Sequence, residues 1–190
     1  MDEAMFCFQC EQAANCTACT GKAGVCGKSA ETAAAQDRLT GALISYAGQL
    51  VGEGRAPAPE QALLLMEGLF TTITNVNFNN STIKAIKTEV EQEKHRISSE
   101  KFENYSMPEI WDGNADIRSL KSLVLFGLKG MAAYAYHARV LGKTCREVDQ
   151  FFYEALYHLG EDEPQDVLLP LVLKLSLIHI SEPTRHAQIS

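Results

Sequence analysis

The chain has 190 residues, of which 46% are hydrophobic and 22% are charged, and its formal net charge is −7. This composition predicts a soluble globular protein with enough residues for a hydrophobic core. Because the balance is acidic and no block of lysine and arginine occurs, a nucleic-acid partner is not expected. The most apolar run, residues 167–180, is interrupted by Pro170 and Lys174. It is shorter than the ~20 residues that span a bilayer, so no membrane partner is expected either.

Five of the six cysteines lie in residues 5–29, MFCFQCEQAANCTACTGKAGVCGKS. Thiols at this density serve a disulfide framework, a zinc site or an iron-sulfur cluster. Cys7 and Cys10 place two sulfurs on one tight loop, and Cys19 and Cys26 can close a cage from a second loop. We interpret these four residues as thiolate ligands of an iron-sulfur cluster, with Cys16 as a spare thiol.

Two alternatives to a cluster, a zinc site and a disulfide framework, remain open at this point. A zinc ribbon pairs two C-x2-C knuckles across about 15–20 residues, whereas only five residues separate Cys10 from Cys16. Three glycines, at positions 21, 24 and 27, favour a cluster because they let the backbone approach an inorganic core and aim N–H groups at its sulfides. Gly27-Lys28-Ser29 is similar to the end of a phosphate-binding loop. Lys22, however, occupies the position of that loop's first glycine, so nucleotide binding is not expected.

Beyond the cysteines the periodicity is helical, and no strand pattern occurs. The first helix is expected over residues 30–50 with Ser29 as its N-cap, and the second over 60–74 with Pro59 in its first turn. A third follows the caps at 79–81, with an apolar stripe at Ile83, Ile86, Val90 and Ile97. Its charged face, which includes Lys94, is expected to face water. Residues 98–114 then form an irregular connection.

Two more helices are predicted, over residues 116–141 and from 145 or 146 to 159. The residues of this half whose side chains could bind a metal or take part in catalysis are interpreted as structural. Cys145 is expected to be a buried or half-buried thiol, and His137 and His158 to be packing or surface residues. Trp111 is expected to pin the connection. The periodicity predicts an all-α domain, organised as a cysteine-rich segment, residues 1–28, and a helical domain, residues 29–174.

The last residues of the chain have a sequence that is unusual for a protein. Residues 175–185, LSLIHISEPTR, can be back-translated into one reading frame of a transposon-end adapter used to prepare sequencing libraries. We therefore expect residues 175–190 to be an adapter artefact, and the natural chain to continue beyond Lys174.

The cysteine segment, with FCFQCEQ at residues 6–12 and CTGKAGVCGK at 19–28, resembles the N-terminus of hybrid cluster proteins, or hydroxylamine reductases. Three blocks match downstream: AAQD at 34–37, GLFTTITNVN at 68–77 and GLKGMAAYA at 127–135. The resemblance covers about residues 5–174. It implies that Cys7, Cys10, Cys19 and Cys26 bind a cubane [4Fe-4S] cluster, that Cys16 is not a ligand, and that about six helices form two three-helix bundles. Carbon monoxide dehydrogenases share the later architecture, but the FCFQC opening favours hybrid cluster proteins.

The resemblance also implies a function. Members of the family are oxidoreductases that reduce hydroxylamine to ammonia and water, and nitric oxide is a proposed substrate. The N-terminal cluster would relay electrons from a donor redox protein to a hybrid iron-sulfur-oxygen cluster whose ligands lie in later domains. This chain is therefore expected to be an inactive fragment, in the cytoplasm, where thiols stay reduced. The alternative is a stand-alone iron-sulfur or zinc binding module.

Overall fold

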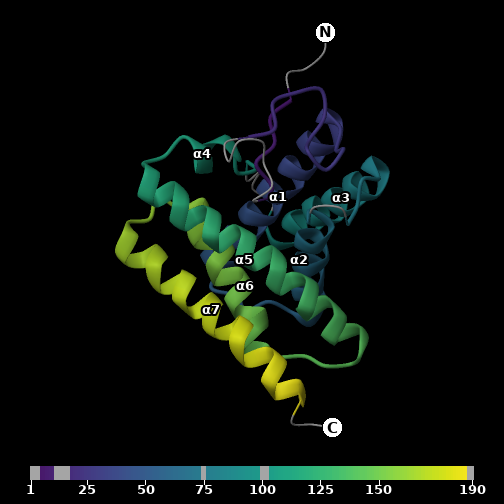
Figure 1. Ribbon diagram of the computed structural model, residues 1–190. Helices are drawn as coiled ribbons and strands as arrows, with labels where there is room; N and C mark the ends of the chain where they lie inside the picture. Colours follow the sequence, from purple (N-terminus) through teal and green to yellow (C-terminus); the bar gives the residue numbers. More distant parts are fainter. Residues whose placement is uncertain (1–4, 11–17, 74–75, 99–102, 188–190) are drawn as a thin grey trace.

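The computed structural model describes residues 5–10, 18–73, 76–98 and 103–187, with side chains as far as residue 177. Within these residues the chain is all-α, as predicted, and forms no strand (Figure 1). The helices are α1 (Ala30–Gly52), α2 (Pro59–Thr71), α3 (Asn80–Ile97), the single turn α4 (Pro108–Trp111), α5 (Ala115–Val140), α6 (Arg146–Gly160) and α7 (Gln165–Ala187).

Local capping explains where the helices begin. The side chains of Ser29, Asn79 and Asn114 each accept a backbone N–H from the first turn of α1, α3 and α5. Pro59 occupies the first position of α2, where the missing N–H costs no hydrogen bond. The predicted N-cap Ser29 and the predicted helix starts are therefore confirmed.

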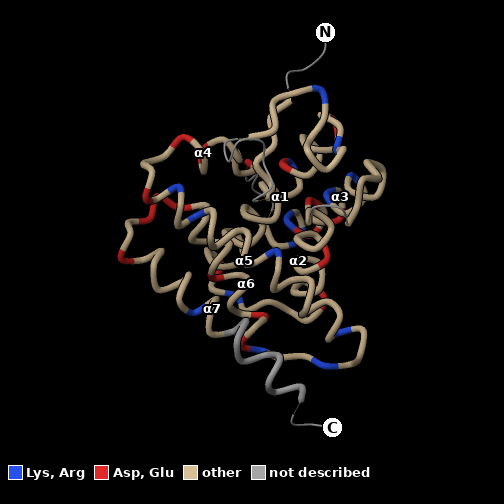
Figure 2. Tube along the Cα trace, viewed as in Figure 1, with Lys and Arg blue, Asp and Glu red and all other residues tan. Residues whose placement is uncertain are grey.

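Three long helices precede the connection that contains α4, and three follow it. Helix α1 packs against α3 and α6, while α5 packs against α2 and α7. In Figure 1, α5 and α7 run side by side, and the cysteine segment lies next to the start of α1. Buried residues of both halves form one continuous hydrophobic core. Residues of both charge signs are interspersed over the helices (Figure 2).

The connection returns to α1 at Gly41. The backbone N–H of Tyr105 donates to the Gly41 carbonyl over 3.3 Å. A Cβ atom at position 41 would lie only 2.1 Å from the carbonyl oxygen of Tyr105. Only glycine fits between the two backbones, so this residue fixes the distance between the connection and α1.

We expect Gly41→Ala to lower the free energy of unfolding by about 1–3 kcal/mol, the usual cost of overpacking a rigid contact. Gly52→Ala is the matched control, because position 52 is in the same helix and a Cβ there meets nothing within 4 Å. The control should be neutral or slightly stabilising. Urea unfolding followed by circular dichroism measures both values, and equal stabilities would contradict the predicted clash.

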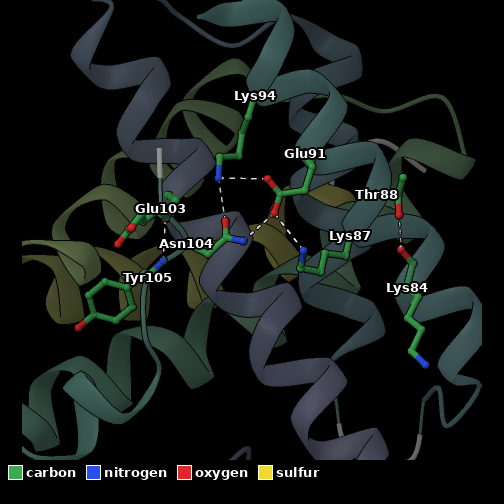
Figure 3. Close-up of polar contacts among 9 residues, drawn as sticks. Lys84, Lys87, Thr88, Glu91, Lys94, Glu103, Asn104 and Tyr105 are labelled. Carbon is green, nitrogen blue, oxygen red and sulfur yellow. Dashed lines mark hydrogen bonds and ion pairs between the residues drawn. The ribbon is translucent and has the colours of Figure 1, made fainter. Parts of the chain in front are cut away.

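The prediction that Lys94 faces water is wrong. Lys94 is buried, and its Nζ donates to Asn104 Oδ1 at 2.7 Å and pairs with Glu91 Oε2 at 3.3 Å (Figure 3). Burial opposes ionisation of Glu91, but hydrogen bonds from Asn104 and Lys87 outweigh it and keep the Glu91 pKa below its usual value. The connection supplies Asn104, which covers this part of the charged face. Lys84 and Glu89, farther from the connection, are exposed as expected.

The last helix, α7, continues past Pro170 and through the residues that we interpret as adapter-derived. Leu175, the first of these, is buried, and a Cβ atom on Gly127 would lie 2.0 Å from its Cδ2 atom. In the described part of the chain, no helix is both long and apolar enough to cross a membrane.

Candidate metal centre

The backbone of the cysteine segment places two predicted ligands opposite each other. Cys7 and Cys19 exchange both backbone hydrogen bonds, with N···O distances of 3.1 and 2.9 Å, in an isolated antiparallel bridge. Both residues are 7% exposed, and they pack with Met5 and Ala33, which belongs to the first turn of α1. The segment is therefore anchored to the N-terminal end of α1.

A second bridge, between Ala23 and Ser29, closes the turn that carries Cys26. Gly27 adopts a φ of 84°, which favours glycine. The N–H groups of Gly24 and Gly27 donate to the carbonyls of Lys28 and Gly24. These two N–H groups therefore stabilise the turn itself, and the expectation that they point at cluster sulfides is not met.

The four predicted ligands differ in exposure. Cys7 and Cys19 are buried, whereas Cys10 and Cys26 are half-buried, and all four are free thiols. Among the described residues, no group of three or more histidine, cysteine, aspartate or glutamate side chains is close enough to hold a metal ion. The structure thus pairs Cys7 with Cys19 and does not bring all four sulfurs to one point. Cys16 lies outside the described residues.

A buried chain of polar side chains links the first cysteine pair to two helices. Gln9, between Cys7 and Cys10, donates its amide N–H to Asp37 Oδ1 on α1. Its amide oxygen accepts a hydrogen bond from Nζ of Lys129 on α5. Gln9 and Lys129 are each 3% exposed. The turn between the two cysteines is therefore tied to α1 and α5 at once.

A parallel chain holds the second cysteine turn. Lys28, two residues after Cys26, donates from Nζ to Gln36 Oε1 on α1. Gln36 in turn donates to the backbone oxygen of Asn77 at 3.0 Å, in the segment between α2 and α3. Lys28 and Gln36 are both fully enclosed. Two buried lysines, Lys28 of the segment itself and Lys129 of α5, thus lie close enough to Cys7 to interact with its charge.

Burial dominates the electrostatics of this region. It raises the pKa of the Cys7 thiol, and the charge of Lys28 opposes the rise. Burial also lowers the pKa of Lys129 to about 8, against the carboxylate of Asp37. The pKa of Asp37 is raised by burial, against the hydrogen bond from Gln9 and the charge of Lys129. A buried thiolate here requires positive charge nearby, from a metal ion or from these lysines.

The residues present fit a cluster held by thiolates. Free thiols are the donors that iron-sulfur clusters use, and two of them belong to residues that lie directly opposite each other in the backbone bridge. Lys28 and Lys129 supply the positive charge that gathered thiolates need. Sequence reasoning did not identify this network. Its members do lie in the blocks that carry the resemblance: FCFQC, CGK, AAQD, the NVN end of GLFTTITNVN, and GLKG.

Of the residues interpreted as structural, Cys145, His137 and His158 make their contacts outside this region, whereas Trp111 contacts it. Cys145 is half-buried at the N-cap of α6 and contacts Glu147 Oε2 at 3.2 Å, so its predicted packing role is confirmed. His137 is exposed, and Nδ1 of His158 pairs with Glu163 Oε1 at 2.6 Å. Trp111 pins the connection as predicted. Its ring meets that of Phe8, a residue of the cysteine segment, edge-on at a centroid distance of 4.8 Å.

The similarity of the chain to known proteins agrees with the family resemblance of its cysteine segment. The Prismane/CO dehydrogenase family matches residues 5–184. The hydroxylamine reductase of Nitratidesulfovibrio vulgaris is 35% identical over 202 residues, which cover 90% of this chain and 36% of that protein. The hydroxylamine reductase of Bacteroides thetaiotaomicron is 36% identical over 195 residues, 91% of this chain and 35% of that protein.

The chain thus spans about a third of the length of the curated relatives it matches. The match begins at Met5, just before the first cysteine pair, and continues through every helix into α7. The chain belongs to the Prismane/CO dehydrogenase family, and its relatives are hydroxylamine reductases.

Proposed function

We propose that this chain is the N-terminal electron-transfer domain of a hydroxylamine reductase, and that Cys7, Cys10, Cys19 and Cys26 bind a [4Fe-4S] cluster. The observation that supports this most is the bridge that sets Cys7 opposite Cys19 above two buried lysines. When bound, such a cluster accepts and releases single electrons with little reorganisation of its surroundings.

The residues of the chain would serve that role in three ways. Four thiolates hold the iron, and the bridge and the Ala23–Ser29 turn fix the two halves of the segment. Packing with Met5 and Ala33 excludes water from Cys7 and Cys19. Cys10 and Cys26, which are half-buried, lie nearer to the surface and leave a side open to a donor redox protein.

In the whole protein we place this domain upstream of the reaction. Electrons would pass from the donor protein through these thiolates to a hybrid iron-sulfur-oxygen cluster held by later domains. There hydroxylamine would take up two electrons and two protons to give ammonia and water, with nitric oxide as a second candidate substrate. A cytoplasmic location would keep the thiols reduced.

Metal analysis of the chain purified without oxygen tests the proposed cofactor. We expect about four irons and four sulfides per chain, as in a [4Fe-4S] cluster, with a broad visible absorption that bleaches on reduction. A colourless protein that contains zinc and no iron would overturn the proposed function in favour of a zinc module.

The 190-residue chain alone should not reduce hydroxylamine, because the proposed reaction centre takes its ligands from later domains. Turnover with a reduced dye measures this, and the Cys7→Ala variant, which is expected to bind no cluster, gives the background rate. A rate well above that background would show that the reacting group lies within these residues.

A further inference from the structure

Four segments of the chain meet in one largely buried charged network. They are the two cysteine turns, the start of α1 and the middle of α5. The network consists of two hydrogen-bonded sets, Asp37–Gln9–Lys129 and Lys28–Gln36, which meet where Gln36 and Asp37 are neighbours on α1. Burying this many polar groups is costly unless they are paired. A purely structural role would be served equally well by apolar residues, so the charges themselves call for an explanation.

The contacts of Gln9 orient the first cysteine turn. Its amide nitrogen donates to Asp37 while its amide oxygen accepts from Lys129, so both ends of the side chain are held. Gln9 lies between Cys7 and Cys10 in the sequence. Lys129 therefore acts on the two sulfurs through Gln9, from a helix that is 120 residues away along the chain.

The charges of the network do not cancel. Two lysines and one aspartate leave an excess of one positive charge; both lysines are buried and the aspartate is half-buried. The charges of Cys7 and Cys10, when these are thiolates, favour the ammonium form of Lys129. A negatively charged group bound at the cysteines would balance this excess.

On the proposed function, we propose that Lys129, assisted by Lys28, is a positioning residue that holds the Cys7–Cys10 turn through Gln9 and sets the reduction potential of the cluster. Reduction adds one negative charge to the cluster, and a nearby buried positive charge stabilises the reduced form more than the oxidised form. Lys129 therefore raises the potential, and Asp37 lowers it.

The decisive test compares two variants that should shift the potential in opposite directions. Lys129→Met removes a positive charge at similar side-chain length and should make the midpoint potential more negative. Asp37→Asn removes a negative charge with the same shape and should make it more positive. We expect each to change the reduction equilibrium by tenfold or more, which is 59 mV for a one-electron couple. Redox titration of the anaerobically purified chain, followed by electron paramagnetic resonance at pH 7, measures both.

Lys121→Met is the matched control. Lys121 is also a buried lysine of α5, but its Nζ donates to the backbone oxygens of Leu159 and Glu161 at the end of α6. Its removal imposes a similar cost on the fold without touching the cysteine segment. The potential of this variant should equal that of the unmodified chain.

A second measurement tests the positioning role. Release of iron to a chelator should be faster from Lys129→Met than from Lys121→Met, and Lys129→Arg, which keeps a donor and the charge, should restore slow release. If Lys129→Met does not fold, Asp37→Asn decides the question, since it preserves the shape of the network.

The outcomes separate this inference from the proposed function. An unmodified chain without iron overturns the function. An unmodified chain with a cluster, together with Lys129→Met and Asp37→Asn potentials that match the control or move in the same direction, overturns the inference alone. Opposite shifts in the stated directions support it.

Discussion

Replacing any one of Cys7, Cys10, Cys19 or Cys26 with alanine should abolish the visible absorption of the anaerobically purified chain. We expect the iron content to fall by at least tenfold, because even the loss of a supporting partner of a metal ligand costs about 10–100-fold in affinity. A cluster short of one thiolate also exposes iron to water and to exchange. Iron analysis and visible absorption of the four variants measure the effect.

Cys145→Ala is the control for this experiment. Its thiol is half-buried at the start of α6 and contacts Glu147, so its removal should leave iron and absorption unchanged. Circular dichroism must show that all five variants keep their helices. If iron is retained by all four ligand variants, or lost equally from Cys145→Ala, the ligand set is wrong.

Cys16→Ala addresses the spacing of the motif. Cys16 and Cys19 could form a second C-x2-C knuckle, as a zinc site would use, whereas the cluster interpretation leaves Cys16 as a spare. The variant should therefore keep its iron. Loss of metal from Cys16→Ala together with retention in Cys26→Ala would favour the zinc knuckle.

The helices could be predicted from the sequence because their determinants are local. The side chain of Ser29 accepts the backbone N–H of Thr32, three residues later in α1. The ring of Pro59 fixes the backbone of the first turn of α2. The stripe at Ile83, Ile86 and Val90 is buried as its spacing indicates. Each of these features acts within one or two turns, so no knowledge of distant segments is needed.

Lys94 and Trp111 show what local patterns leave out. The charge pattern predicted that Lys94 is exposed to water, but Asn104 of the connection accepts a hydrogen bond from it. The sequence predicted that Trp111 pins a loop, but Phe8 as its partner could not be predicted. In both cases the partner comes from another part of the chain, and only the packing of the helices brings the two together.

In the candidate site too, the local features could be predicted and the long-range contacts could not. Cysteine spacing predicted four ligands, and the structure sets two of them, Cys7 and Cys19, opposite each other. The charged network beneath them was not predicted, because Lys129 and Gln9 are 120 residues apart. Its residues did occur in the blocks that resemble the family, so asking why charged residues recur in those blocks could have identified the network.

The prediction with the largest effect on stability concerns the contact between α1 and α6. Phe152 is fully buried in the core shared by both halves of the chain. Alongside it, the rings of Tyr153 and Tyr46 lie 6.4 Å apart, and a Cβ at Gly160 would lie 2.9 Å from Ile44 Cγ2. The two helices are thus in close contact along this face, and little space remains into which the core could collapse.

We expect Phe152→Ala to lower the free energy of unfolding by about 3–5 kcal/mol, since it removes a large apolar side chain and leaves a cavity. For a chain of this length that corresponds to a decrease in melting temperature of about 6–20 °C. Phe78→Ala is the matched control, because Phe78 is 41% exposed, and it should cost less than about 1 kcal/mol. Thermal and urea unfolding measure both variants.

The result also bears on the candidate site, because α1 carries Gln36 and Asp37 beneath the cysteines as well as the face that packs on α6. If the chain unfolds as one unit, the cluster absorption and the helical signal of Phe152→Ala should disappear at the same temperature. Loss of the absorption well below the helical transition would show that the cysteine segment opens independently of the core, and that its attachment through Gln9 and Lys28 is weaker than the buried network indicates.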